Sequence, residues 1–440
     1  MRKIFWSFMA VLLAAMFLGI PTIQAADISF GGQILNRAER VDTNEDGSAA
    51  DWQIGERLRL NTTAKAGGVT GFAQLQWVHA WGNNTWINGA TGVDADQAAG
   101  VHQAHITVPN FYGSGWNLKL GRQEIVLDGH RLFGHTGWHL NAVTHDAAVL
   151  INPAWDLTYA YSFGVEDDSD GDSVAEDAVF HVFRKGLSVA GGKTALYFVA
   201  ADDATGSDAL VWYTAGVRQA GKAAGYDYRV EVYHQFGEFA PLATGAGTWA
   251  SSTGEHGADM DAWMFGARLG KKVNKTKVTL WYDYLSGNDD SDANNNSWGA
   301  FHTIADTGHK FYGLIDQFLP RAGNNTDFLG IQDAAIKLVH PVSPGWTLKG
   351  DYHRFWTAED PGDNLTAWVG ESVGTANGCE CAEMYLGEEI DLTLKHKYSS
   401  NLAIQFGYSW FSGTETYMNI AGRAVADDKH WAYAQANFTF

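Results

Sequence analysis

The chain has 440 residues, with 50 acidic side chains against 30 basic ones and a formal net charge of -20 at pH 7. This excess of carboxylates leaves no basic patch to neutralise phosphates, which argues against a nucleic acid partner. Aromatic residues make up 13% of the chain, beside 50 glycines and 8 prolines, yet the mean hydropathy is -0.21. Such a composition fits a membrane β-barrel, because the polar lumen and loops dilute the apolar outer face.

The first 26 residues have the organisation of a secretory signal. Arg2 and Lys3 precede an apolar run over 4–20, and small residues follow at Ala25 and Ala26. We predict cleavage after Ala25 or Ala26, which leaves residues 27–440 as one mature domain and, without the two basic charges, takes the net charge from -20 to -22. A retained helical anchor is the alternative, although the run is barely long enough to span a membrane.

From residue 27 onward the chain reads as strands separated alternately by short and long connections. Beyond the N-terminus no apolar run reaches the length of a membrane helix, so a membrane location requires a closed barrel. The predicted strands cover 27–41, 52–66, 69–81, 101–109, 115–125, 143–151, 154–165, 177–187, 194–202, 209–219, 224–237, 259–271, 275–287, 331–340, 345–357, 384–398, 401–412 and 429–440.

Several of these strands alternate apolar and ionised residues. In 275–287, Val278 and Leu280 alternate with Lys277 and Asp283. A dry β-sandwich core would leave such inward charges without solvent, whereas a water-filled lumen accommodates them. We therefore predict an all-β fold, a transmembrane antiparallel up-and-down barrel of about 18 strands with short periplasmic turns and long extracellular loops.

The last strand ends on a terminal aromatic residue, Phe440. Ala432, Ala434 and Ala436 share one face with it, opposite polar side chains. This pattern is typical of a final barrel strand that pairs with the first, and we expect Phe440 to contact the barrel-assembly machinery. An edge strand of a soluble sheet is the alternative, but it would leave a sticky unpaired edge.

Two groups of side chains raise the question of metals. Asp42, Asn44 and Asp46 have the opening spacing of a calcium loop, but Gln53 replaces the closing glutamate. We expect a plain acidic loop there, with calcium as the alternative. His130, His135, His139 and His145 cluster around the third long loop, where polar packing is favoured over a transition metal. No cofactor is predicted.

Catalytic motifs do not stand out in the sequence. There is no Gly-x-Ser-x-Gly nucleophile elbow and no nucleophile placed beside a base and an orienting group. We therefore predict that the protein is not an enzyme. There is also no nucleotide-binding motif to power transport, so any solute would move down its gradient.

Three stretches resemble the alginate-export family of outer-membrane porins. They are 121–134 (GRQEIVLDGHRLFG), 309–316 (HKFYGLID) and 387–394 (GEEIDLTL), and together they span most of the mature chain. The resemblance implies a monomeric eighteen-stranded barrel in the outer membrane of a Gram-negative bacterium, in contact with lipid. It also implies a channel, narrowed by a loop, for an anionic polysaccharide.

The same resemblance implies arginines around the constriction that attract carboxylates. By position the candidates are Arg57, Arg59, Arg122, Arg131 and Arg354. For each, a salt bridge within the barrel wall is the competing interpretation. The third long loop, 126–142, is the predicted constriction, and loop 288–330 is also long enough to fold inward.

The functional prediction is a porin for passive passage of hydrophilic solutes, with an anionic oligosaccharide or polysaccharide as a candidate. Export of alginate itself is the first alternative, because the acidic loops are unfavourable to a polyuronate. A closed barrel that acts as a surface scaffold or adhesin is the second. Conduction through the lumen separates the scaffold from the two channels.

Overall fold

The computed structural model describes residues 26–42, 52–81, 100–167, 176–203, 210–239, 258–289, 297–319, 326, 328–360, 383–420 and 428–440. The predicted signal, 1–25, therefore lies outside the described residues. So does the calcium spacing at Asn44 and Asp46, while Asp42 is described only as the last residue of the first strand. Among the described residues, no helix is long and apolar enough to cross a membrane.

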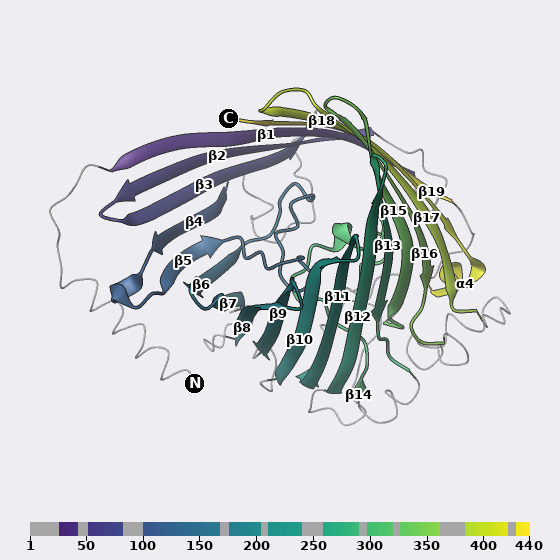
Figure 1. Cartoon of the computed structure of the whole chain (residues 1–440), viewed down its shortest axis with the longest axis horizontal. Coiled ribbons are helices and arrows are strands. Elements are labelled where there is room, and N and C mark those ends of the chain that lie inside the picture. Colours follow the sequence, from purple (N-terminus) through teal and green to yellow (C-terminus); the bar gives the residue numbers. More distant parts are fainter. Residues whose placement is uncertain are drawn as a thin grey trace.

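Long antiparallel strands make up most of the described chain (Figure 1). The first nine are β1 (Asp27–Asp42), β2 (Trp52–Ala66), β3 (Val69–Ala80), β4 (Gly100–Val108), β5 (Asn117–Gln123), β6 (His145–Asn152), β7 (Leu157–Asp167), β8 (Glu176–Val189) and β9 (Gly192–Asp203). The others are β10 (Leu210–Ala223), β11 (Tyr226–Phe239), β12 (Ala258–Val273), β13 (Thr276–Leu285), β14 (Ser297–Trp298), β15 (Ile331–Ser343), β16 (Trp346–Trp356), β17 (Tyr385–Lys397), β18 (Leu402–Gly413) and β19 (Lys429–Thr439).

Within the described residues, helical structure is confined to three short pieces in the connections. They are the 3₁₀ turns η1 (Phe111–Gly113) and η2 (Gly308–Lys310) and the helix α4 (Glu415–Ile420). Of the nineteen strands in the sheet, β14 has two residues and pairs in parallel with β12. The other eighteen form a closed antiparallel barrel, which confirms the predicted fold class and strand number.

The barrel closes where β1 pairs with β19. The ladder runs from Gln33 opposite Thr439 to Asp42 opposite His430. Phe440 extends this seam, because its N–H donates to Gly32 O at 3.1 Å and its own carbonyl accepts from Gly32 N at 2.9 Å. The terminal aromatic therefore completes the pairing that the sequence predicts.

The apolar and polar faces alternate along each strand as expected. Phe30 on β1 and Leu280 on β13 face outward and are 80% and 53% exposed, while Glu231 on β11 and Asp283 on β13 face inward and are 1% and 0% exposed. Apolar side chains on the outer face are unfavourable in water. They are stable in lipid, because contact with lipid removes their surface from water.

Candidate functional site

Two connections fold into the barrel and define the candidate site. The first lumen loop is residues 124–144, and the second lumen loop is residues 299–319. Leu132 and Phe133 of the first are 2% and 0% exposed, as expected for apolar side chains packed inside the lumen. This agrees with the predicted inward position of 126–142. Phe311 and Tyr312 of the second lumen loop are both 0% exposed, so the described part of 288–330 also turns inward.

Backbone hydrogen bonds join the two loops. Gly134 N donates to Ala305 O at 2.8 Å, and Ala305 N donates to Leu132 O at 3.0 Å. Phe133 and Ala305 thus form a short parallel bridge. Because buried backbone groups need partners, this bridge lets both loops lie within the lumen without orphaned amides. The loops act as one unit.

Arg131 holds this unit to the barrel wall. Its Nη2 lies 2.5 Å from Asp283 Oδ2 on β13, and its Nη1 donates to the Tyr312 hydroxyl at 2.6 Å. The guanidinium also lies 3.7 Å from the centre of the Phe311 ring. Burial alone would lower the pKa of Arg131, but Asp283, Tyr312 and Glu231 together outweigh it and raise the pKa, so the side chain stays charged. Arg131 is in the lumen, and its role is structural.

Arginines on β1 and β2 hold the other side of the first lumen loop. Arg57 Nη1 donates to the carbonyl oxygens of His139 and Leu140, at 3.2 and 3.1 Å. Arg37 Nη1 donates to the carbonyl of Trp138 at 2.8 Å and lies 4.3 Å from the centre of its ring. The end of the first lumen loop near Trp138 is therefore fixed by two arginines that donate hydrogen bonds to its backbone oxygens.

Arg59 belongs to a small polar network behind this loop. It donates to Gln76 Oε1 at 2.7 Å, contacts His102 Nε2 at 2.9 Å and lies 3.6 Å from Glu124. Burial would raise the pKa of Glu124, but its contact with His102 and the charge of Arg59 lower it below its usual range. Arg57 and Arg59 point to the interior of the barrel, where both are buried, and their contact with solute stays a prediction.

Arg122 and Arg354 lie on the outer face, so the prediction that they line the lumen is wrong. Arg122 lies opposite Ala104, an exposed residue of β4, and pairs with Asp146 at 2.7 Å. Arg354 alternates with the fully buried His353 and lies 4.6 Å from the ring centre of Tyr385. The physical reason is the strand period of two, which puts each arginine on the lipid-facing side.

A further group of cations surrounds the tip of the first lumen loop at Gly129. A Cβ at Gly129 would lie 3.1 Å from Arg229 Nη1 and 3.5 Å from Arg218 Nε. Lys310 Nζ, from the second lumen loop, donates to Gly129 O at 3.2 Å. Burial lowers the pKa of Lys310, and the positive charge of Arg229 lowers it further. The potential at this tip is therefore positive.

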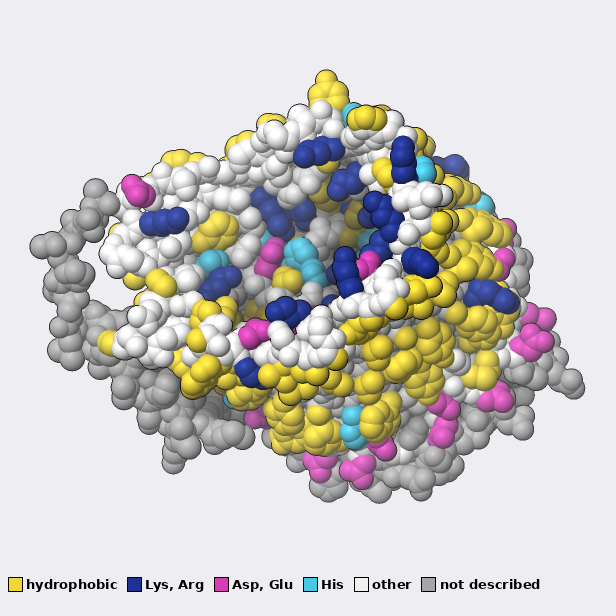
Figure 2. Space-filling model, in the orientation of Figure 1, with side chains coloured by type: hydrophobic (Ala, Val, Ile, Leu, Met, Phe, Trp, Pro, Cys, Tyr) yellow, Lys and Arg dark blue, Asp and Glu magenta, His cyan; other side chains and the backbone are white. Residues whose placement is uncertain are grey.

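Counting the charges around the tip shows a cationic excess. Among the described residues, six basic side chains meet four carboxylates in this network, namely Arg131, Arg184, Arg218, Arg229, Arg268 and Lys310 against Asp128, Asp156, Glu231 and Asp283. Arg218 Nε is buried with no hydrogen-bond partner among these residues. Figure 2 shows Lys and Arg side chains gathered around the hollow of the barrel.

The neighbouring wall, β15 to β17, has an acidic cluster around His353, which begins at Asp333, the ladder partner of Asp283 on β13. Lys337 is the single basic partner, within the described inward positions of this wall, of Asp333, Asp351 and Asp391 around His353. The next inward residue of β17, Glu389, accepts hydrogen bonds from the backbone N–H groups of residues 314 and 315 at 2.6 and 2.9 Å. The lumen thus has a basic side around Gly129 and, next to it, an acidic side around His353.

The histidines of the first lumen loop pack as polar loop residues. His130 contacts the Thr307 hydroxyl at 3.4 Å and lies 5.4 Å, ring to ring, from His135. Burial, with the charge of Lys310, lowers the pKa of His130 to about 4. These histidines do not join the His and Asp group that comes within metal-binding distance among the described residues, which lies on β16 and β17.

Comparison with known proteins identifies the family. A model of the alginate export family matches residues 26–429. The chain belongs to the alginate export family. No curated protein matches it.

Solved porins share the fold of this alginate export family barrel. Acinetobacter baumannii OccAB4 is 10% identical, with a TM-score of 0.58 over 95% of this chain and 99% of that chain. A. baumannii OccAB1 is 14% identical, with a TM-score of 0.56 over 93% and 96%. Pseudomonas aeruginosa OccK8 (OprE) is 10% identical, with a TM-score of 0.55 over 94% and 98%. Identities this low establish the fold alone, and family and fold together support an outer-membrane channel.

Sequence reasoning missed the arginines that matter most in this geometry. Arg37 and Arg218 were not among the candidates, although each falls on the inward set of its strand, where Leu35 and Trp212 are also buried. The alternation of side chains was the signal that could have found them. The partner of Arg131 could not be found in this way, because Asp283 is 152 residues away in the sequence.

Proposed function

We propose that the protein is an outer-membrane channel that selects for anionic hydrophilic solutes. The observation that carries this proposal is the cationic excess around Gly129, six basic groups against four carboxylates. A narrowing lined by one sign of charge raises the local concentration of the opposite ion, because low-dielectric walls focus the field.

The net charge of -20 does not oppose this proposal. The acidic run 166–177 spans the end of β7 and the start of β8, and charges separated by more than a Debye length of about 8 Å are largely screened at physiological salt. At physiological salt the distant acidic groups are screened, so the electrostatic potential in the lumen is set by the side chains that face the lumen. The selectivity of the channel follows the constriction rather than the average charge.

The solute class that fits best is a carboxylated oligosaccharide. Guanidinium groups bind carboxylates in a bidentate geometry, and Arg218, whose buried Nε has no hydrogen-bond partner among the described residues, has donor capacity to offer. Membership of the alginate export family supports the same class. Export of alginate itself is the second candidate, and the family match is the observation that favours it.

The test is the reversal potential of the refolded channel in a planar bilayer under a KCl gradient. Arg218→Gln with Arg229→Gln lowers the preference for chloride, because two cations at the narrowing are lost. The matched control is Arg122→Gln with Arg354→Gln, which removes the same two charges from the outer face and leaves the reversal potential unchanged.

Either of two results contradicts the proposal. One is an equal shift of the reversal potential in both double variants, since the charge would then act through the whole molecule. The other is the absence of any current through the folded wild-type protein, which favours the closed scaffold. If oligouronates block the anion current strongly and neutral oligosaccharides block it only weakly, the result supports a carboxylated oligosaccharide as the solute.

A further inference from the structure

His353 is held in one orientation by a buried carboxylate on the acidic side of the lumen. Its Nδ1 lies 2.8 Å from Asp333 Oδ1, and both residues are 0% exposed. Its Nε2 lies 3.0 Å from Lys337 Nζ. An ammonium can only donate, so Nε2 is the acceptor and the Nδ1 proton goes to Asp333. The imidazole is therefore neutral, and its Nε2 lone pair faces the interior of the group.

The carboxylates in this group outnumber the cations. Asp333, Asp351 and Asp391 surround one ammonium, that of Lys337, which lies 3.1 Å from Asp351 Oδ2. Asp391 is 2% exposed, and its Oδ2 has no N–H or hydroxyl partner among the described residues, only the neighbouring carboxyl of Glu389. A buried carboxylate oxygen without a partner is costly, so the group has a deficit of positive charge.

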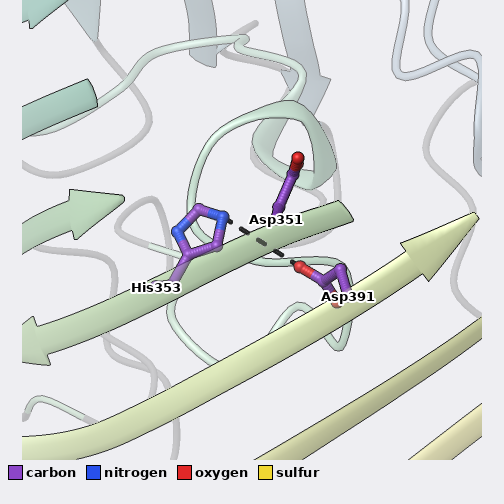
Figure 3. A group of neighbouring side chains, drawn as sticks. All are labelled: Asp351, His353 and Asp391. Carbon is purple, nitrogen blue, oxygen red and sulfur yellow. Dashed lines mark ion pairs between the residues drawn. The ribbon is translucent and has the colours of Figure 1, made fainter. Parts of the chain in front are cut away.

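We propose that this group binds a divalent transition-metal ion through His353 Nε2 and the carboxylates of Asp351 and Asp391. One ligand atom from each residue lies within 4.8 Å of the others. Figure 3 shows His353 on β16 facing Asp391 on β17, with Nε2 and Oδ2 4.0 Å apart. A neutral imidazole with two carboxylates is a donor set that suits Zn²⁺, Mn²⁺ and Fe²⁺.

Asp333 takes the part that an outer carboxylate plays at histidine metal sites. By accepting from Nδ1 it fixes the tautomer and orients the ring, and such partners affect metal affinity by about 10- to 100-fold. The hydrogen bond from Ser409 to Asp391 Oδ1 leaves Oδ2 as the ligand atom. Both arrangements point one donor atom of each side chain toward the same space.

Lys337 is the cation that a metal would replace. Its Nζ lies within hydrogen-bond distance of two of the proposed ligand residues, so metal and ammonium compete for the same donors. The Trp281 ring centre lies 4.7 Å from Nζ and offers the displaced ammonium a cation–π contact. Lys337 therefore lowers the affinity of the group for a metal ion. A purely structural role for the group does not predict this effect.

The metal would stabilise the wall where the second lumen loop is attached. It joins β16 to β17, and Glu389, which receives the amides of residues 314 and 315, is the inward neighbour of Asp391 on β17. This inference goes beyond the proposed selectivity, since it concerns the acidic side of the lumen. Its test does not depend on ion flux.

The experiment uses tag-free, refolded full-length barrel in detergent, titrated with Zn²⁺ by calorimetry and with Co²⁺ by visible absorption. One high-affinity site is expected in the wild type. Asp351→Asn, at a half-buried position, weakens Zn²⁺ binding at least 10-fold, as does His353→Gln. Lys337→Met strengthens it at least 10-fold, and Zn²⁺ raises the unfolding temperature of that variant more than it does for the wild type.

The matched control is His234→Gln. His234 also pairs with an aspartate, Asp261, at 2.8 Å, but it lies on the outer face of β11, and its loss leaves Zn²⁺ binding unchanged. Folding of each variant is checked by heat-modifiable migration on gels. Zn²⁺ binding that is the same in wild type, Asp351→Asn and Lys337→Met overturns the proposal, as does a Co²⁺ spectrum without a ligand-field band.

Discussion

Replacing Arg131 by Met releases the two lumen loops from the wall while the barrel stays folded. The change removes the cation that lies 2.5 Å from Asp283 and the donor to Tyr312. Asp283 then keeps the weaker contacts from Arg268 Nη2 at 3.5 Å and Trp281 Nε1 at 3.1 Å. The negative charge of Asp283 then stays buried with fewer positive and hydrogen-bonding partners.

The expected cost is about 3 kcal/mol, the lower end for breaking a buried pair, because Arg268 retains part of the attraction. Each 1.4 kcal/mol is a factor of ten, so the balance between seated and released loops shifts roughly 100-fold toward release. Most of the cost falls on the loops, since the strand ladders on either side of Asp283 do not involve Arg131.

Two assays detect the release. Single-channel recordings show larger and noisier conductance, and limited trypsin digestion cleaves faster after Lys310 in the second lumen loop. Arg131→Lys, which keeps the charge but loses the fork that reaches both Asp283 and Tyr312, gives an intermediate result. Arg354→Met is the matched control on the outer face. Conductance and cleavage equal to wild type in Arg131→Met would refute the assigned role of Arg131.

Two further predictions concern the same loops. Gly313 has a φ of 84°, and a Cβ there would lie 2.5 Å from the Glu389 carboxylate. Gly313→Ala therefore displaces that carboxylate and speeds trypsin cleavage after Lys310. Gly113→Ala is the control, since Gly113 has a φ of 70° but nothing within 4 Å of the added Cβ, and it leaves the cleavage rate unchanged. His130, whose pKa is lowered to about 4, is neutral in the seated loop, so the seated form is stable above pH 6.5 and loses stability as the pH falls toward 4. Conductance recorded across this range depends less on pH in His130→Gln, and parallel curves for the two proteins contradict this assignment.

The barrel fold could be predicted from the sequence because the patterns that indicate it are local and recur from strand to strand. Val230 and Val232 alternate with Arg229 and Glu231, and this period of two reappears in strand after strand. Short connections such as Gly67-Gly68, with φ values of 55° and 80°, mark the turns. The strand bounds consequently agree with the predicted ranges to within a few residues.

The outward arginines were mispredicted although the same period contained the answer. Arg122 shares its face with Leu118 and Leu120, which are apolar, whereas Lys119 and Gln123 share the other. The family resemblance suggested a role for Arg122 that its own strand contradicts. Register, read from the neighbours at i-2 and i+2, was the better guide.

The contacts inside the lumen could not be predicted, because they join segments far apart in the chain. Arg131 meets Tyr312 across 181 residues, and no periodic pattern connects irregular loops. The same holds for the balance of charge. The acidic total describes the loops, while the wall around Gly129 collects its cations from β8, β10, β11 and β12 and from both lumen loops.

The most direct test of the proposed anion channel is the reversal potential of the wild-type protein in a tenfold KCl gradient. A basic narrowing predicts a potential displaced toward that of chloride, despite the formal charge of -20 on the chain. A potential displaced toward that of potassium would show that the acidic residues control passage, and it would contradict the assignment of the Gly129 region as the selective element.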